Sequence, residues 1–202
     1  MPLLRYAGIA LAGLSLLLIA IDLAIGARER AGFDPEAFRA AALDYDVEIL
    51  RDPFGVPHIH GTRDADVAFG LAFAHAQDDI ETIESSIPMY RGRAGRFEGF
   101  DALPLDYLIQ WLGTRDAVDR GYEQELSPEV RAVIEGYAAG LNYYAARHPE
   151  EVDARLYPIT REDIVAAFSV QHLFFYGFQR TLGELFADTR QRDISNGPAR
   201  MG

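Results

Sequence analysis

The sequence predicts an α+β fold that is mostly helical and carries one short β-hairpin. Three long stretches, at about 64–85, 128–148 and 160–178, repeat apolar residues at helical spacing. One short stretch, 47–60, alternates apolar and polar residues on either side of a turn, which is typical of a hairpin. The chain has 202 residues, of which 49% are apolar, so it is long enough to bury a sizeable core.

Composition excludes some classes of function. The formal net charge is −12, and such a field repels phosphate backbones, so we expect no nucleic-acid partner. The chain has no cysteine, which excludes disulfides, thiolate metal sites and a cysteine nucleophile within these residues.

The first 27 residues have the pattern of a targeting segment. Arg5 precedes sixteen uncharged residues, 6–21, which are mostly Leu, Ile, Ala and Gly. Asp22 ends this run and the small residues 24–27 follow, as in a secretory signal. The run is slightly shorter than the roughly 20 residues of a spanning helix, so a cleaved signal and an uncleaved inner-membrane anchor through residues 6–21 both remain open. Either predicts a periplasmic or secreted protein.

Residues 28–45 are predicted to be a charged linker. Asp34-Pro35-Glu36 within it is a helix start, with proline at the first helical position.

The first strand pair follows the linker. Asp52-Pro53-Phe54-Gly55 has the residue preferences of a type I turn between strands 47–51 and 56–60. His58 and His60 share a strand face, as a metal pair would. No third ligand is nearby in the sequence, which favours hydrogen-bonded structural histidines.

The helix that starts at Asp64 or Asp66 is apolar almost all round in its first half, which predicts burial. Gln77-Asp78-Asp79 places carboxylates at the end of that apolar run, where they need partners. The segment that follows supplies Arg91, Arg93 and Arg96, so we expect a structural ion-pair network here rather than a catalytic carboxylate.

The other two helices have strong start signals. Ser127-Pro128-Glu129 combines a cap, a proline and an acid in the first turn, and Thr160 with Asp163 matches a capping box. The last helix is dense in aromatic residues, including Phe174 and Phe178, which could pack in a core or line an apolar pocket. Glu184 follows as a helix-end charge, an arginine partner or an oxygen ligand for a hard cation.

Several motifs in register resemble those of the penicillin acylase family, in the order in which that family carries them. They are Val47–Ile59, Phe69–Asp78, Arg91–Arg93, Glu98-Gly99, Asp106 with Leu112-Gly113, and Glu135–Asn142. The resemblance covers about residues 46–186. It implies the αββα fold of the N-terminal nucleophile hydrolases, of which this chain supplies the α-chain part and a missing β-chain the rest.

The resemblance also implies how the protein works. Members are exported precursors that cut themselves, typically after a glycine, and the freed N-terminal residue becomes the nucleophile with its own α-amine as base. On this reading residues 46–190 form the α-chain domain, residues 191–202 are a spacer, and Gly202 flanks the cut. No catalytic residue then lies within the 202 residues, and the isolated chain is expected to be inactive.

Site residues follow from the same resemblance. Phe174 and Phe178 match positions that line the acyl pocket, and Glu184 matches the α-chain ligand of a structural calcium ion. No organic cofactor is implied. Asp79 departs from the family pattern because arginine is common at that position, so its ion pair is expected with Arg91 or Arg93 instead.

The sequence therefore predicts the small-chain portion of an exported amidohydrolase that removes an acyl group from an amide. N-acyl-homoserine lactones and penicillins are the substrates the resemblance implies, and the missing β-chain is the protein partner. A rival of another class is a non-catalytic, membrane-anchored binding or interaction fragment of the same fold. The residue that follows Gly202, and the length of chain after it, would discriminate the two.

Overall fold

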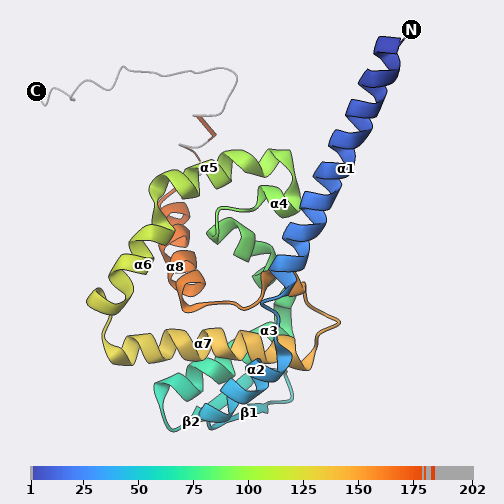
Figure 1. The fold of residues 1–202 in the computed structure, drawn as a ribbon. Coiled ribbons are helices and arrows are strands. Elements are labelled where there is room, and N and C mark those ends of the chain that lie inside the picture. The colour runs from blue at the N-terminus through green and yellow to red at the C-terminus, as the bar shows by residue number, and fades with distance from the viewer. Residues whose placement is uncertain (1, 179, 181–182, 185–202) are drawn as a thin grey trace, which may run out of the picture.

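The computed structural model describes residues 2–178, 180 and 183–184, with Tyr6 as the only side chain described before Leu11. It is mostly helical with one two-stranded hairpin, which confirms the predicted fold class (Figure 1). The spacer 191–202 lies outside the described residues. The elements are α1 (Pro2–Arg30), α2 (Pro35–Ala41), η1 (Ala42–Asp44), β1 (Val47–Arg51), β2 (Pro57–Gly61), α3 (Asp64–Tyr90), α4 (Gly95–Glu98), η2 (Phe100–Ala102), α5 (Leu103–Leu112), α6 (Thr114–Glu125), α7 (Pro128–Arg147), η3 (Ala154–Leu156) and α8 (Arg161–Phe175).

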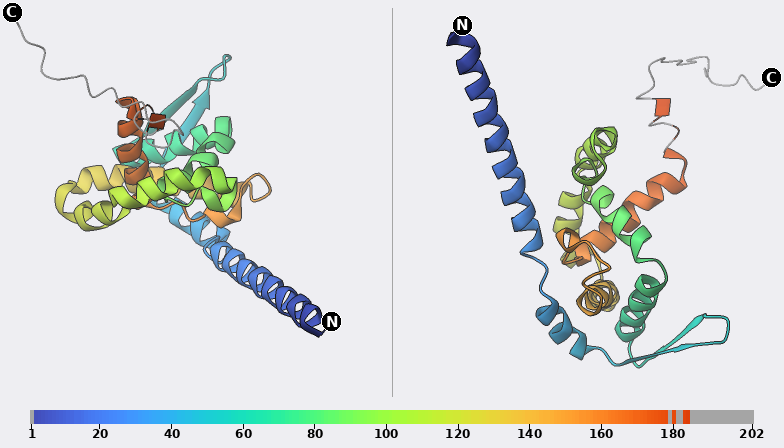
Figure 2. Two further views of the ribbon diagram at one scale, coloured as in Figure 1. Left: turned by 90° about the horizontal axis from the view of Figure 1, so that it is seen from above. Right: turned by 90° about the vertical axis from the view of Figure 1, so that its right-hand side faces the viewer.

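The N-terminal helix projects from the body, and two further views show that most of its length stands clear (Figure 2). One helix of the described chain is long and apolar enough to cross a membrane, and a signal sequence near an N-terminus passes the same test. Within the predicted linker, α2 packs against α7. Asp34 caps α2 as predicted, because its Oδ1 accepts hydrogen bonds from the backbone N–H groups of Glu36 and Ala37.

The hairpin pairs antiparallel, with Val47 opposite Gly61 and Ile49 opposite Ile59. It packs on α3 at Gly70, where a Cβ atom would lie 2.6 Å from Val47 Cγ2 and 2.8 Å from Ile59 Cγ2. Only glycine lets the sheet approach this closely. His58, on the solvent face, has its Nε2 3.7 Å from Asp52.

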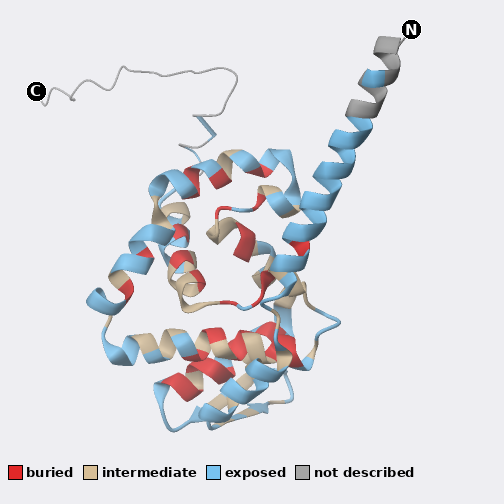
Figure 3. Cartoon of the chain, viewed as in Figure 1, coloured by how far each residue is buried: buried red, intermediate tan, exposed pale blue. Residues whose placement is uncertain are grey.

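The core lies where α3 crosses α7, and Figure 3 shows buried residues concentrated there. Gly140 sits directly on the α3 backbone, since a Cβ atom there would overlap the carbonyl oxygen of Phe69. The buried cluster around this crossing consists of Ala72, Ala76, Ile87, Leu141, Tyr144, Ala145, Leu156, Tyr157 and Ile159.

The carboxylates Asp78 and Asp79, at the end of the apolar run of α3, have other partners than the sequence predicted. Asp79 breaks α3 with non-helical dihedrals (φ −160°, ψ 64°), and its Oδ1 accepts from the backbone N–H of Thr82 at 3.1 Å. Asp79 is therefore an exposed cap at a kink, and the prediction that it pairs with Arg91 or Arg93 is wrong. Its neighbour Asp78 pairs with Arg51 at 2.8 Å, because the end of β1 lies beside this turn of α3.

Candidate functional site

The predicted site residues lie on α8 and just after it. Their position therefore depends on the contacts that fix the start of α8. Thr160 Oγ1 accepts from the backbone N–H of Asp163 at 3.4 Å, and Asp163 Oδ2 accepts from the N–H of Thr160 at 2.8 Å. This capping box is the predicted one. Just before it, the side-chain amide of Asn142 on α7 makes two hydrogen bonds of 2.8 Å to the backbone of Ile159. The start of α8 is thus fixed to α7.

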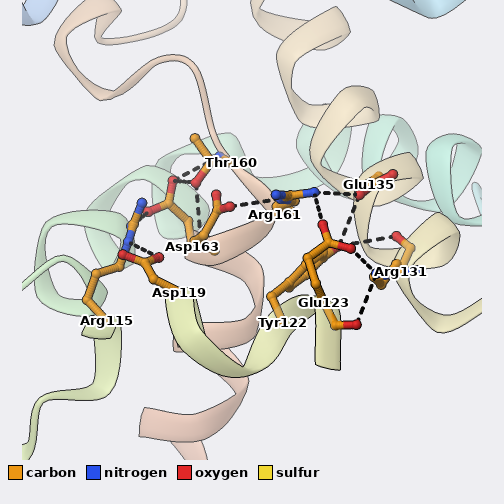
Figure 4. A network of polar contacts seen from close by, with 10 residues as sticks. Arg115, Asp119, Tyr122, Glu123, Arg131, Glu135, Thr160, Arg161 and Asp163 are labelled. Atoms are coloured by element: carbon orange, nitrogen blue, oxygen red, sulfur yellow. Dashed lines mark hydrogen bonds and ion pairs between the residues drawn. The ribbon is translucent and has the colours of Figure 1, made fainter. Parts of the chain in front are cut away.

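The buried Asp163 is also the centre of an ion-pair network, and Figure 4 shows its contacts with Arg115 and Thr160. Its carboxylate is 1% exposed and binds Arg91 at 3.0 and 2.7 Å and Arg115 Nη1 at 2.9 Å. Burial would raise the pKa of this carboxyl, but the hydrogen bonds and charge of Arg91, with support from Arg115, hold it below its ordinary value. Asp163, charged at neutral pH, therefore ties α8 to the end of α3 and to α6.

A second, more exposed network is centred on Arg161, two residues before Asp163. Arg161 Nη1 lies 3.2 Å from both Glu123 and Glu135, and its guanidinium sits over the ring of Tyr122 at 4.4 Å from the centroid. Burial, together with the charge of Glu135, raises the pKa of the Tyr122 hydroxyl to about 12. These contacts join α6, α7 and α8.

An apolar groove of about 420 Å³ runs between α6 and α8. The apolar side chains that line it are Leu112, Ala117, Val118, Tyr122, Leu126, Val165 and Leu173. Its size and lining suit a small apolar group.

The structure places the two predicted pocket phenylalanines at the end of α8. Phe174 is half-buried in the last turn, and Phe178 is half-buried beyond a turn at Gly177, whose φ of +80° favours glycine. The groove takes Leu173 from this helix and neither phenylalanine. Phe175, between them in sequence, is 85% exposed. Sequence reasoning missed Leu173, although the spacing Val165, Ser169, Leu173 marks one helix face.

Glu184 is exposed, and Gly202 lies outside the described residues. Calcium takes six to eight oxygen ligands, and Glu184 supplies one carboxylate. In the described part of the chain, the clustered group of three potential ligands is His148, Glu150 and Glu151, which does not include Glu184. His58 and His60, for which the sequence favoured a structural role, are also outside this group. A calcium site at Glu184 would need oxygens from outside the described residues.

No described serine or threonine hydroxyl forms a hydrogen bond with an imidazole. Serine hydroxyls such as Ser169 Oγ donate to carbonyls of their own helix. His75 Nδ1 lies 2.7 Å from the Tyr137 hydroxyl, and burial raises the pKa of that hydroxyl, which disfavours its ionised form.

Comparison with known proteins gives consistent matches. The family model "Penicillin amidase" matches residues 46–197. The acyl-homoserine lactone acylase PvdQ of Pseudomonas fluorescens (strain Pf0-1) is 32% identical over 155 residues, which are 73% of this chain and 18% of that protein. Penicillin acylase 2 proenzyme of Pseudomonas sp. (strain SE83) is 34% identical over 104 residues, 52% of this chain and 13% of that protein. The chain thus spans less than a fifth of the length of these relatives.

Among solved structures, a thermostable penicillin G acylase from Alcaligenes faecalis has a similar fold. The TM-score is 0.56 with 21% sequence identity, over 78% of this chain and 97% of that chain. At this identity the likeness concerns the fold.

Proposed function

Because this chain belongs to the penicillin amidase family and corresponds to its α-chain region, we propose that it is the small-chain portion of an exported amidohydrolase. The observation that carries the proposal is the family match over residues 46–197, which contains the whole body from β1 to α8. The family is an α/β heterodimer of N-terminal nucleophile hydrolases, so the protein partner is a β-chain.

The proposed reaction is removal of an acyl group from an amide. The nucleophile is the first residue of the β-chain, activated by its own α-amine. The two relatives are named for acyl-homoserine lactone and penicillin, and we propose N-acyl compounds of these classes as substrates. The aromatic end of α8, with Phe174 and Phe178, would bury the acyl group, at about 25 cal/mol per Å² of apolar surface.

The proposal divides the chain as the sequence suggests. Residues 1–27 direct export to the periplasm or beyond, residues 46–190 form the α-chain domain, and processing of the precursor separates this domain from the β-chain. Glu184 contributes one carboxylate to a structural calcium ion whose other ligands come from the β-chain. In this arrangement the buried Asp163 network sets the position of α8, and hence of the pocket wall.

The proposal is tested on the complete precursor. The gene, including all codons after Gly202, is expressed in a Gram-negative host, and the products are separated and sequenced from their N-termini. We expect a large chain that begins with serine, threonine or cysteine directly after Gly202, and hydrolysis of an N-acyl-homoserine lactone or penicillin G.

Two controls accompany that measurement. Replacement of the residue after Gly202 by alanine should abolish both processing and hydrolysis, and the 202-residue chain alone should be inactive. A stop codon after Gly202 with no separate large chain, or binding of acyl compounds without turnover by the complete protein, would favour the non-catalytic fragment.

A further inference from the structure

We propose that α1 stays on the mature protein as a membrane anchor. We also propose that residues 22–33, the last turns of α1 and the three residues after it, hold the folded body against the bilayer surface, and we call this segment the foot. This inference rests on the proposed export, and it chooses the retained anchor over the cleaved signal.

The foot is bound to the body through Arg96. Asp22 and Glu29, two helical turns apart on one face of α1, both pair with the Arg96 guanidinium, Glu29 at 3.6 Å. Gly26 lies between them on this face and is buried. A Cβ atom there would lie 3.6 and 3.9 Å from the guanidinium nitrogens of Arg30 and Arg96, which are ordinary contact distances, so this face of the helix lies against the Arg96 side chain.

The end of the foot continues into the core. A Cβ atom on Gly32 would lie 2.9 Å from both Pro158 Cδ and the Tyr157 carbonyl oxygen. The ring of Phe33 packs edge-on against the buried Tyr157, with 5.8 Å between the centroids. Residues 22–33 are therefore part of the folded body rather than a free linker.

The rest of α1 has the opposite character. Every large apolar side chain from Leu11 to Ile21 is exposed, by 46% to 67%. A helix that is apolar all round and uncovered by protein requires an apolar solvent, and a lipid bilayer is the one that suits its length. Residues 6–21 span about 24 Å at 1.5 Å per residue. A bilayer core of about 30 Å accommodates such a span by local thinning and by snorkelling of flanking charges.

The charges at the foot suit a membrane surface. Arg28 and Arg30 stand in the last turn of α1. Arg28 lines one cavity of about 460 Å³ with the exposed Arg93, with Glu29 and with Arg155, which pairs with Asp153. Long basic side chains beside an apolar span can extend into the polar headgroup region of a bilayer.

Cleavage would remove parts that the fold uses. A cut after Gly26 or Ala27 would take away Asp22 and Gly26 and leave Glu29 as the remaining α1 partner of Arg96. Within residues 24–27, which resemble a cleavage site in the sequence, Gly26 is buried against the body, whereas Ala24, Ile25 and Ala27 are exposed.

Retention is tested on the complete precursor, expressed in a Gram-negative host. The intact mass of the small chain is measured after purification, and membranes are washed with carbonate. We expect a mass that includes residues 2–27 and a chain released only by detergent. A small chain that starts at Ala27 or Arg28 and is soluble in the periplasm would overturn the anchor and leave the amidohydrolase proposal standing. A protein that never leaves the cytoplasm would overturn both the export and the anchor. Amide hydrolysis by the purified protein is measured separately, so that failure of the anchor is distinguished from failure of the amidohydrolase proposal.

The foot is tested with two versions carrying a heterologous cleavable signal, so that the mature chain starts at Asp22 or at Arg28. We expect the Asp22 version to melt about 2–4 °C higher. R96Q should remove most of this difference, whereas R93Q, on the same segment, should keep it. Equal melting temperatures for the two versions, or a difference that R96Q leaves intact, would overturn the foot.

Discussion

Arg91 and Asp163, 72 residues apart in sequence, form a two-point ion pair, with Nε–Oδ1 at 3.0 Å and Nη2–Oδ2 at 2.7 Å. Arg91 is the C-cap of α3 and Asp163 stands in the first turn of α8, so the pair joins the ends of these two helices. Arg115 binds the same carboxylate from α6. One buried carboxylate therefore fixes the relative position of three helices.

Removal of this charge should destabilise the protein strongly. D163N leaves two arginines facing a neutral amide. Breaking a buried ion pair costs about 3–5 kcal/mol. Because the side chains of Arg91 and Arg115 are 20% and 43% exposed, we expect the free energy of unfolding to fall by about 3 kcal/mol, the lower end of this range. The measurement is thermal unfolding of the complete precursor. D119N is the matched control, because Asp119 also faces Arg115, at 3.5 Å, but is 53% exposed and should cost less than about 0.5 kcal/mol. Equal losses in the two variants would contradict the role of Asp163.

The same carboxylate should make stability depend on acid. Burial acts to raise the pKa of Asp163, but Arg91 and the other partners bring it below its ordinary value. A carboxyl whose pKa is lower in the folded state stabilises fully above the unfolded pKa of about 3.9 and loses that contribution as pH falls through the folded pKa. The melting-temperature gap between wild type and D163N should therefore be constant above about pH 5 and shrink below about pH 4. A gap that stays unchanged down to pH 2.5 would show that this carboxyl does not titrate as described.

Close packing of α3 on α7 gives a third prediction. In G140A the new methyl group would overlap the Phe69 carbonyl oxygen and lie 2.8 Å from the Ala72 Cβ, so the helices must separate. We expect a loss of about 3 kcal/mol in the free energy of unfolding. G121A is the control, because on α6 the new methyl meets only the flexible end of Glu125 and should stabilise by up to about 1 kcal/mol. If both variants melt like wild type, α3 and α7 do not pack at this distance.

Calcium removal tests Glu184. If Glu184 holds calcium together with the β-chain, a chelator should lower the melting temperature of the processed enzyme, since a ligand of the folded state stabilises it. E184Q should already melt lower and respond less to the chelator, whereas E98Q, at another exposed glutamate, should respond like wild type. An E184Q enzyme with the full chelator response would move the calcium site elsewhere.

The fold was predictable where its signals are local. The caps at Asp34 and Thr160 and the turn at Asp52–Gly55 act through neighbours in the chain, so residue type and spacing reveal them. The kink at Asp79 was not predictable from spacing, because the apolar pattern continues past it and only the backbone geometry shows the break.

The pairing of charges was less predictable. The sequence shows that carboxylates and arginines must meet, but not which ones, because that depends on how helices cross. Asp163 was identified as a capping acid, yet its burial and its two arginine partners come from the packing of α3 and α6 on α8. The lining of the groove was also not predictable, because the rotation of α8 about its own axis decides that Leu173 rather than Phe174 lines the groove.

The assignment of Phe174 and Phe178 is tested in the complete enzyme by substrate preference. If these half-buried rings close the acyl pocket, F174A and F178A open space for additional methylenes, each worth about 0.8 kcal/mol when buried. The ratio of kcat/KM for a long acyl chain to that for a short one should then rise about tenfold, within the range that a hydrophobic pocket can discriminate. F175A is the matched control, because Phe175 belongs to the same helix end but is 85% exposed, so this ratio should stay within about twofold of wild type unless the β-chain covers it. Unchanged acyl preference in both F174A and F178A, with processing intact, would remove these residues from the pocket and direct attention to the neighbouring face of α8 that carries Leu173.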